Sequence, residues 1–294
     1  MDEKNKMNVE IAKAYAYCEK IIKKHSKSFY FAFSKLPKEK ANAVYAIYAF
    51  CRLADDSIDE AETKEEQAKA LKKLTEELKE FEQGVEADQY LWIVLRDVFN
   101  RYSMSVQPFY DQIKGQTMDY YFKQPQTMKE LEDYSYYVAG SVGLMLLPII
   151  ASENHKHLEG EAIALGVAMQ LTNILRDIGE DFKEIRRIYL PKDVMAQFGY
   201  SEAELAKEVI NDVLIQMWEY IASRAEQLYD DFSQSLKHFD KDSQQQVALA
   251  AKVYEGIINA VRENRYDCST MKNKTSTATK ALLYKDVKNN FSAR

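Results

Sequence analysis

Residues 38–60 read KEKANAVYAIYAFCRLADDSIDE, an apolar segment that ends in four acids within six positions. Ala, Tyr, Ile and Phe recur in it at helical spacing, which predicts a buried helix over residues 38–60. Asp55 and Asp59 are four residues apart, so on a helix they are separated by about 40° and lie on one face. These like charges repel each other, and the first Lys that follows is Lys64. The segment is therefore either an exposed acidic helix end or half of a site that uses the acids.

The composition of the whole chain favours helices. Its 294 residues include only 9 Gly and 5 Pro, which is typical of long helices joined by short loops. No strand-like alternation competes with the helical spacing, so we expect an all-α fold that forms a single domain over residues 1–294. The expected helices span residues 9–24, 38–60, 63–83, 87–103, 106–122, 127–151, 158–183, 203–236, 241–266 and 276–289.

The charge of the chain argues against a nucleic-acid partner. Lys and Arg number 40 against 46 Asp and Glu, a formal charge of −6, so there is no general basic surface. The tail, residues 268–294, carries a net +5, which leaves about −11 on the rest. Such a tail suits an anionic ligand or a peripheral contact with a membrane surface, and a solvated helix end is the alternative.

Three features predict a soluble, cytoplasmic protein. Cys18, Cys51 and Cys268 are far apart and odd in number, which indicates neither a disulfide framework nor a structural zinc site. The first ten residues lack the apolar segment of a secretory signal. The longest apolar stretch, residues 138–151, is shorter than the roughly 20 residues that span a bilayer.

A second acidic constellation follows Gln170, where the chain reads QLTNILRDIGEDF. Asn173, Asp177 and Asp181 follow one another at four-residue steps, and all four side chains share one face of an otherwise apolar helix. A buried stripe of an amide and two carboxylates needs compensation, and such oxygen ligands suit Mg²⁺ with substrate phosphates completing its shell. Two acidic faces across a helical cavity would hold several Mg²⁺ ions, with a diphosphate between them.

Cationic residues flank both acidic faces. Arg52 lies one turn before the first acids and Arg176 immediately before Asp177, so each is placed to reach phosphate oxygens. The cluster HSKSF, residues 25–29, offers further phosphate donors just after a helix, although on its own it would be an ordinary helix end.

The segment DYSYYVAGSVGLM, residues 133–145, combines tyrosines with small residues. Glycines inside a helix are destabilising and need a reason. Close helix packing is one reason and a groove for a hydrocarbon chain is the other; together with the acidic motifs we favour the groove. The Tyr faces would also suit carbocations.

These residues together resemble the squalene/phytoene synthase family. The resemblance rests on D-x-x-x-D at Asp55 and Asp59, a second D-x-x-x-D at Asp177 and Asp181, HSKSF at residues 25–29 and RRIYLP at residues 186–191. Their order and separation also match, and the resemblance covers a core of about residues 10–266. It implies an isoprenoid synthase fold, a bundle of about ten helices around a central cavity.

The resemblance also implies the chemistry. Two prenyl diphosphates are joined head to head: the first ionises with the help of two or three Mg²⁺ ions, and the second captures the cation to form a cyclopropyl diphosphate. A second ionisation and rearrangement then give the linear product.

By resemblance, specific residues carry this reaction. The implied Mg²⁺ ligands are Asp55, Asp59, Asn173, Asp177 and Asp181. The implied contacts to the substrates are His25, Ser26, Lys27, Ser28, Tyr48, Arg52, Gln170, Asn173, Arg176 and Tyr254. Catalysis is implied for the four aspartates, for Arg52 and for Tyr134, which with Tyr48 would lie near the reacting carbons.

Within the family the chain most resembles the bacterial dehydrosqualene (4,4′-diapophytoene) synthases, which condense two molecules of farnesyl diphosphate and need no NADPH. We expect Phe33 and Tyr45, bulky residues flanking the first motif, to close the tunnel at C15 length. One departure concerns the C-terminal part, where the family usually carries an Arg a few residues after Tyr266-Asp267. This chain has Lys272 there, a point charge without the bidentate fork of Arg.

Four alternatives remain. A phytoene synthase would perform the same chemistry on two geranylgeranyl diphosphates. A cyclising terpene synthase consumes one diphosphate per product and would not be expected to carry HSKSF with two D-x-x-x-D motifs. A ferritin-like di-iron protein requires Glu-x-x-His pairs, and none of the four His has a Glu three residues earlier. A non-catalytic helical interaction protein would tolerate the loss of its aspartates.

Overall fold

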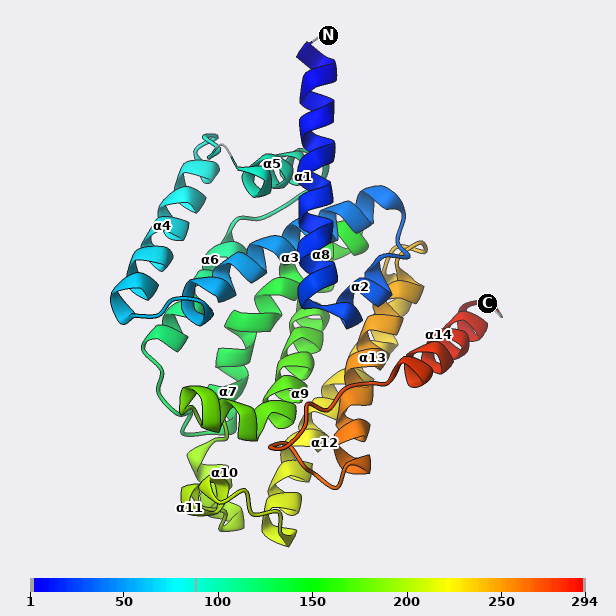
Figure 1. Ribbon diagram of the computed structural model, residues 1–294. Coiled ribbons are helices and arrows are strands. Elements are labelled where there is room, and N and C mark those ends of the chain that lie inside the picture. Colours follow the sequence, from blue (N-terminus) through cyan, green and yellow to red (C-terminus); the bar gives the residue numbers. More distant parts are fainter. Residues whose placement is uncertain (1–2, 88, 293–294) are drawn as a thin grey trace. The chain divides into compact units, whose positions relative to one another are not determined.

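The computed structural model describes residues 3–87 and 89–292, and these residues form helices and connecting segments without a strand (Figure 1). The all-α prediction is confirmed. Contacts within the chain gather it into two compact units, whereas the single domain over residues 1–294 stays a prediction. Unit 1 comprises residues 1–121, 141–159 and 237–247, and unit 2 comprises residues 122–140, 160–236 and 248–294.

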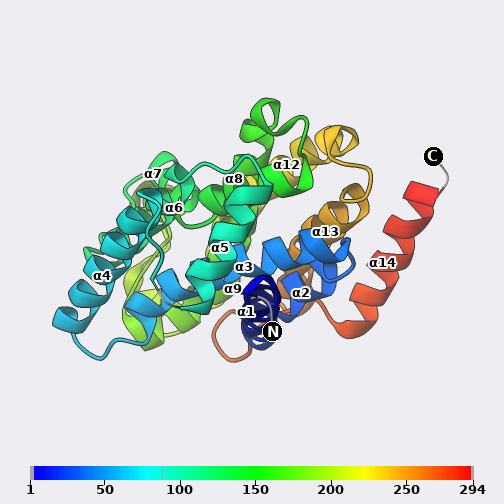
Figure 2. The ribbon, with the colours of Figure 1, turned by 90° about the horizontal axis from the view of Figure 1, so that it is seen from above.

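Unit 1 is built around the predicted acidic helix. Its helices are α1 (Glu3–His25), α2 (Lys27–Phe33), α3 (Lys38–Asp59), α4 (Lys64–Glu82), α5 (Tyr90–Arg101), α6 (Gln107–Tyr120), α8 (Ser141–Ile150) and the 3₁₀ turn η2 (His155–His157). Helix α3 packs against α1, α4, α5, α6 and α8. Figure 2 looks along α1, with α3 and α5 beside it. The centre of unit 1 therefore carries the first D-x-x-x-D motif.

Local sequence explains why α3 and α4 form where they do. Pro37 precedes α3, and the buried face of α3 holds small residues with larger ones such as Ile47 and Phe50. Helix α4 starts with a capping box in which Thr63 and Glu66 satisfy each other's backbone N–H groups. Its expected apolar stripe is buried, with Leu78 fully so.

Unit 2 carries the second acidic motif on its longest helix. Its elements are α7 (Met128–Ser135), the π turn η1 (Tyr136–Gly140), α9 (Glu159–Ile185), α10 (Lys192–Phe198), α11 (Glu202–Ala206), α12 (Asp212–Ser235) and α14 (Thr277–Ser292). Two further elements, the 3₁₀ turn η3 (Leu236–His238) and α13 (Gln244–Glu263), start in one unit and end in the other. Two consecutive residues with positive φ, Arg265 and Tyr266, end the turn after α13.

The observed helices differ from the expected ones in several places. Helices α2 and α10 lie where loops were expected, because seven-residue helices are too short to show a clear period. The expected helix 203–236 is two helices, separated near Glu208, which has a positive φ of 56°, and by the N-cap Asn211. The expected helix 127–151 is interrupted by the π turn η1.

The small residues near this π turn are used for close packing. A Cβ on Gly166 of α9 would lie 2.4 Å from the backbone oxygen of Ala139, and one on Gly140 would lie 3.3 Å from the side chain of Ile163. Close packing against α9 therefore accounts for the small residues Ala139 and Gly140, and the prenyl groove at this place stays a prediction.

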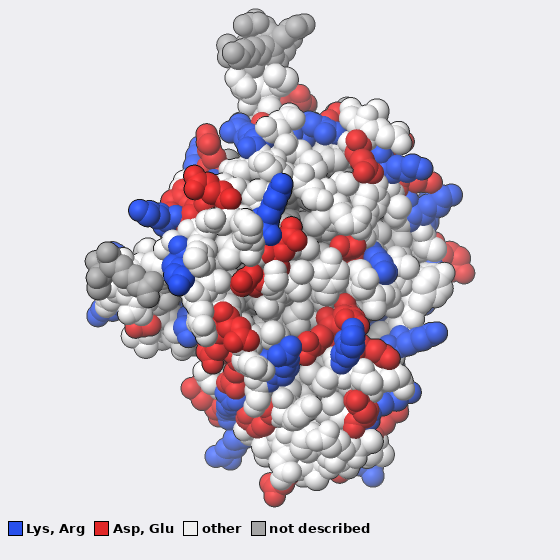
Figure 3. All heavy atoms as spheres, turned by 180° about the vertical axis from the view of Figure 1, so that it is seen from behind, with Lys and Arg blue, Asp and Glu red and all other residues white. Residues whose placement is uncertain are grey.

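The surface is polar and mixed in charge. On the face seen in Figure 3, acidic and basic side chains are interspersed, as expected for a formal charge of −6 on 294 residues. Within residues 3–87 and 89–292, no helix is both long enough and apolar enough to cross a membrane.

Candidate active site

The first acidic face lies on the last two turns of α3. Asp55 is half-buried there and Asp59, the last residue of the helix, is exposed. Burial, and next the charge of Asp59, raise the pKa of Asp55 to about 8. A carboxylate in this position is under-compensated, so the face favours the approach of a cation.

Helix α6 faces Asp55 with polar side chains. The amide nitrogen of Gln116 donates to Asp55 Oδ1 at 2.6 Å, and that of Gln112 donates to the same oxygen at 3.4 Å. Asp119, on the same side of α6, is 8% exposed, and its charge contributes to the raised pKa of Asp55. These three residues belong to the environment of the motif.

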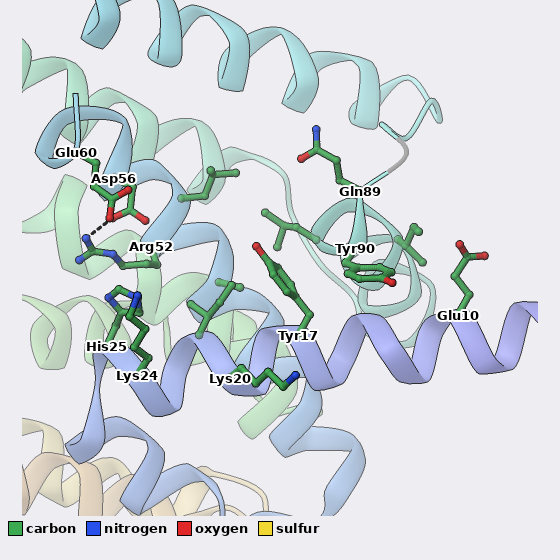
Figure 4. Close-up of a pocket in the computed structure, with 15 residues that line it drawn as sticks. Glu10, Tyr17, Lys20, Lys24, His25, Arg52, Asp56, Glu60, Gln89 and Tyr90 are labelled. Carbon is green, nitrogen blue, oxygen red and sulfur yellow. Dashed lines mark ion pairs between the residues drawn. The ribbon is translucent and has the colours of Figure 1, made fainter. Parts of the chain in front are cut away.

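Arg52 and His25 line one cavity of unit 1. The cavity measures about 700 Å³ and is lined by residues of α1, α3 and α5, by Glu60 just after α3 and by Gln89 just before α5. Figure 4 shows His25, Lys24 and Arg52 at one end, and Tyr17 and Tyr90 towards the other. Arg52 forms an ion pair with Asp56, drawn as the dashed line in Figure 4. The cavity thus combines a charged end with an aromatic wall.

The HSKSF cluster forms the junction between α1 and α2. His25 is the last residue of α1, and Ser26 caps α2 by accepting a hydrogen bond from the backbone N–H of Phe29 at 3.4 Å. Lys27 and Ser28 occupy the first turn of α2. The cluster is therefore a helix end that also brings His25 to the cavity that Arg52 lines.

Aromatic side chains continue from this junction along α2 and α3. The ring centroid of Phe29 lies 6.2 Å from that of Tyr48 and 4.8 Å from that of Phe33. Tyr45 packs on Tyr30 at 5.8 Å. Phe33 and Tyr45 are 3% and 4% exposed, so both residues expected to set chain length are core residues of unit 1.

The second acidic face lies on α9. Asn173 donates to Gln170 Oε1 at 3.5 Å, and Arg176 Nε donates to Asp177 Oδ1 at 2.7 Å. Burial lowers the pKa of Arg176, but the hydrogen bond and the charge of Asp177 outweigh this effect, so the pKa is raised. The charge of Tyr254 of α13 also raises it. The predicted residues of α9 and Tyr254 thus form one polar group within unit 2.

Asp181 lies at the far end of this face, next to the RRIYLP segment. Burial, and next the charge of Asp177, raise the pKa of Asp181 to about 7. The backbone N–H of Arg187 donates to the carbonyl of Asp181 at 3.1 Å, and the Arg187 guanidinium donates to Tyr189 Oη at 3.0 Å. The ring of Tyr189 stacks on Tyr134 at 5.3 Å. The RRIYLP segment therefore connects Tyr134 to the second acidic face.

The segment after α13 contacts α9 at Gly179 and Lys183. The backbone N–H of Gly179 donates to the carbonyl of Cys268 at 3.2 Å, and Lys183 donates to the carbonyl of Ser269 at 3.1 Å. Lys272, which stands where the family usually has Arg, pairs with Glu180 at 2.9 Å. Lys272 is thus bound to the residue of α9 that precedes Asp181 in the sequence.

The donor set fits Mg²⁺. The side-chain oxygen of Asn173 is buried and has no hydrogen-bond partner among the residues that the structure describes. An oxygen in this state gains most from a cation. In that same part of the chain no three His, Cys, Asp or Glu side chains are close enough to hold a metal ion by themselves. Mg²⁺ is ordinarily bound by one or two carboxylates together with water and substrate phosphates.

Sequence reasoning missed the residues that surround the aspartates. Gln112, Gln116 and Asp119 form a polar stripe on one face of the expected helix 106–122, at steps of four and three residues. That spacing was the available sign. Arg187 and Tyr189 lie in the RRIYLP motif, but without the fold nothing in the sequence connects them to Asp181.

Comparisons with known proteins agree with this geometry. The model of the squalene/phytoene synthase family matches residues 22–280. The 4,4′-diapophytoene synthase of Staphylococcus haemolyticus is 37% identical over 257 residues, which make up 86% of this chain and 88% of the relative. The 15-cis-phytoene synthase of Synechococcus elongatus is 33% identical over 268 residues, 87% of this chain and 86% of the relative.

A solved structure extends the likeness to the fold. The crystal structure of a dehydrosqualene synthase in complex with a ligand matches with a TM-score of 0.92 and 44% identity, covering 98% of this chain and all of the other. The chain therefore belongs to the squalene/phytoene synthase family. It is an enzyme of the prenyltransferase class that this family defines.

Proposed function

We propose that the chain catalyses the Mg²⁺-dependent head-to-head condensation of two farnesyl diphosphates, through presqualene diphosphate, to dehydrosqualene, a step towards C30 carotenoids. One observation carries the proposal: the same constellation occurs on two helices. Helix α3 presents an arginine with Asp55 and Asp59, and α9 presents an arginine with Asp177 and Asp181. A reaction that ionises two diphosphates uses such a pair.

The residues of this chain have distinct tasks in the proposed reaction. The five oxygen ligands, Asp55, Asp59, Asn173, Asp177 and Asp181, hold Mg²⁺. The bound ions supply Lewis-acid stabilisation of the leaving diphosphate. Arg52 and Arg176 reach phosphate oxygens by charge-assisted hydrogen bonds, with His25, Ser26, Lys27, Ser28 and Gln170 contributing further contacts.

Aromatic side chains are proposed to stabilise the cations. Tyr134 is 8% exposed and stacked on Tyr189, so its ring is held in a fixed orientation. A rigid ring face stabilises a carbocation without lending it a nucleophile. We assign this role to Tyr134 and Tyr48. We assign to Tyr254, which lies close to Arg176, the role of holding the Arg176 side chain in position.

Two observations favour C15 over C20 substrates. The 4,4′-diapophytoene synthase is more similar to this chain, at 37% identity, than the phytoene synthase, at 33%. Phe33 and Tyr45 fill the core between α2 and α3 with rings, which would block a longer chain. Phytoene synthesis from geranylgeranyl diphosphate is the second candidate, because that relative matches 87% of this chain, a share similar to that of the 4,4′-diapophytoene synthase.

The deciding experiment is mass spectrometry of the hexane-extractable product. Purified protein with Mg²⁺ is given farnesyl or geranylgeranyl diphosphate separately, each with and without NADPH. We expect a C30 product with a central triene from farnesyl diphosphate, unchanged by NADPH. A C40 product instead would make the chain a phytoene synthase, and a reduced C30 product formed only with NADPH would indicate squalene synthesis. No hydrocarbon from either substrate would contradict the proposal.

We also propose a peripheral contact with membranes, which would receive the hydrocarbon product. Met271 and Leu282 are 56% and 68% exposed and lie among the lysines of the basic tail. Apolar side chains among basic residues bind anionic lipid surfaces. Co-sedimentation with vesicles that contain anionic lipid should therefore decrease for a Met271→Ser, Leu282→Ser double variant.

A further inference from the structure

The Asp55 carboxylate is held from one side by two buried amides of α6. Gln116 and Gln112 are 4% and 1% exposed, and both donate to the same oxygen, Oδ1, at 2.6 and 3.4 Å. Buried side-chain amides are uncommon unless they are hydrogen-bonded, and here their donors converge on an acid of the first D-x-x-x-D motif. The Gln116 contact is the shorter and therefore the stronger of the two.

The orientation of the second amide is itself set by another helix. Ser141, the fully buried first residue of α8, donates from Oγ to Gln112 Oε1 at 3.1 Å. Because the amide oxygen accepts this bond, the amide nitrogen of Gln112 must point the other way, towards Asp55. Three helices of unit 1, α3, α6 and α8, thus set the orientation of the Asp55 carboxylate.

We propose that Gln116, supported by Gln112 and Ser141, is a positioning residue that keeps Asp55 Oδ1 bound to the protein and presents Oδ2 to Mg²⁺. The inference rests on the proposed function, because it deepens the role of the α3 face. It assigns no contact with substrate to the glutamines. It makes α6 a structural part of the first metal-binding face.

The neighbourhood explains why such positioning is needed. The negative charges of Asp59 and Asp119 act on Asp55, and the positive charge of Arg52 opposes them only in part. A carboxylate among like charges that lacks fixed donors can rotate away from its ligand position. Residues that orient metal ligands by hydrogen bonds typically change metal affinity or activity by about 10- to 100-fold when they are removed.

The test replaces Gln116 by methionine, which keeps the length of the side chain but removes its donors. Gln246→Met is the matched control, because Gln246 is a half-buried glutamine of unit 1 whose amide donates to the carbonyl of Lys35. Two quantities are measured on each purified protein. The first is the rise in melting temperature caused by Mg²⁺ with inorganic pyrophosphate, and the second is the Mg²⁺ concentration that gives half-maximal turnover.

We expect Gln116→Met to lose most of the stabilisation by Mg²⁺ with pyrophosphate and to need about 10- to 100-fold more Mg²⁺ for half-maximal turnover. Its KM for the prenyl diphosphate at saturating Mg²⁺ should change much less. Gln246→Met should resemble the wild type in both quantities. If Gln116→Met lowers the melting temperature but keeps the wild-type response to Mg²⁺ and pyrophosphate, its role is only structural and the inference is overturned.

A second variant keeps the test decisive if Gln116→Met does not fold. Ser141→Ala removes only the hydroxyl that orients the Gln112 amide, and it should shift the Mg²⁺ dependence in the same direction by a smaller factor. An unchanged Mg²⁺ dependence in Ser141→Ala would then overturn the inference. If wild-type protein itself shows no stabilisation by Mg²⁺ with pyrophosphate, the metal sites of the proposed function fail, and the inference fails with them.

Discussion

Gly179 of α9 and Ser269 are in such close contact that no side chain fits between them. A Cβ on Gly179 would lie 2.1 Å from Ser269 Oγ and 2.7 Å from its Cα. In the sequence Gly179 lies two residues from both Asp177 and Asp181, which places it on the opposite side of the helix. The segment after α13 therefore supports α9 on the side away from its acidic face.

Replacing Gly179 by alanine should therefore destabilise the protein. We expect a loss of about 1–3 kcal/mol, because the backbone of residues 268–270 has to move. Gly160→Ala is the control on the same helix, since a Cβ there meets nothing within 4 Å among the described residues. That change should leave stability unchanged or raise it by up to about 1 kcal/mol. Equal melting temperatures for the two variants would rule out the packing role of Gly179.

The Asp181→Asn variant separates catalysis from stability. Activity should fall by about 100-fold or more, because a group that stabilises developing charge is lost. The melting temperature of the metal-free protein should stay equal or rise, since burial and Asp177 disfavour the charge on Asp181. Glu184→Gln, an exposed change on the same helix, is the control. Nearly full activity in Asp181→Asn would favour the non-catalytic scaffold.

The ion pair between α12 and α13 predicts a pH dependence of stability. Arg262 donates to both oxygens of Glu219, at 2.9 and 2.7 Å, and these hydrogen bonds lower the pKa of Glu219. A lowered carboxyl pKa stabilises the fold above the pKa of the unfolded chain, and this contribution disappears as the pH falls through the folded value. Between pH 7 and about pH 3, the wild type should therefore lose more stability than Glu219→Gln.

Thermal unfolding at both pH values measures this difference. At pH 7, Glu219→Gln should melt about 2–4 °C below the wild type. Glu263→Gln, a change at an exposed acid of α13, should follow the wild-type pH profile. If the wild type, Glu219→Gln and Glu263→Gln all lose the same stability between pH 7 and about pH 3, the Glu219–Arg262 pair does not contribute to the pH dependence.

Substrate length should respond to Phe33 and Tyr45. With both changed to alanine, the ratio of C40 to C30 product in a mixed-substrate assay should rise, because two buried rings of the proposed tunnel floor are removed. Phe109→Ala is the control, as Phe109 is fully buried against Phe50 and Phe99 elsewhere in unit 1. Each change costs about 3–5 kcal/mol, so activity is expressed per folded protein. No gain with geranylgeranyl diphosphate would refute the assignment.

The sequence by itself determined the fold class and the family, because both depend on local spacing. Helical periodicity, sparse Gly and Pro, and carboxylates four residues apart are properties of single helices, so α3 and α9 could be placed with their acids on one face. The motifs quoted for the resemblance lie on or beside these helices, and the comparisons confirm the family.

Only the tertiary structure decided what surrounds the aspartates. The amides of Gln112 and Gln116, the carbonyl of Cys268 and the stacking of Tyr189 on Tyr134 join residues far apart in the chain. Local periodicity shows which face of a helix is polar, but not which neighbouring helix supplies its partners. Those partners follow from packing, which depends on all elements at once. For the same reason the sequence alone does not explain Gly179 of α9, whereas the fold shows that Ser269 packs directly against it.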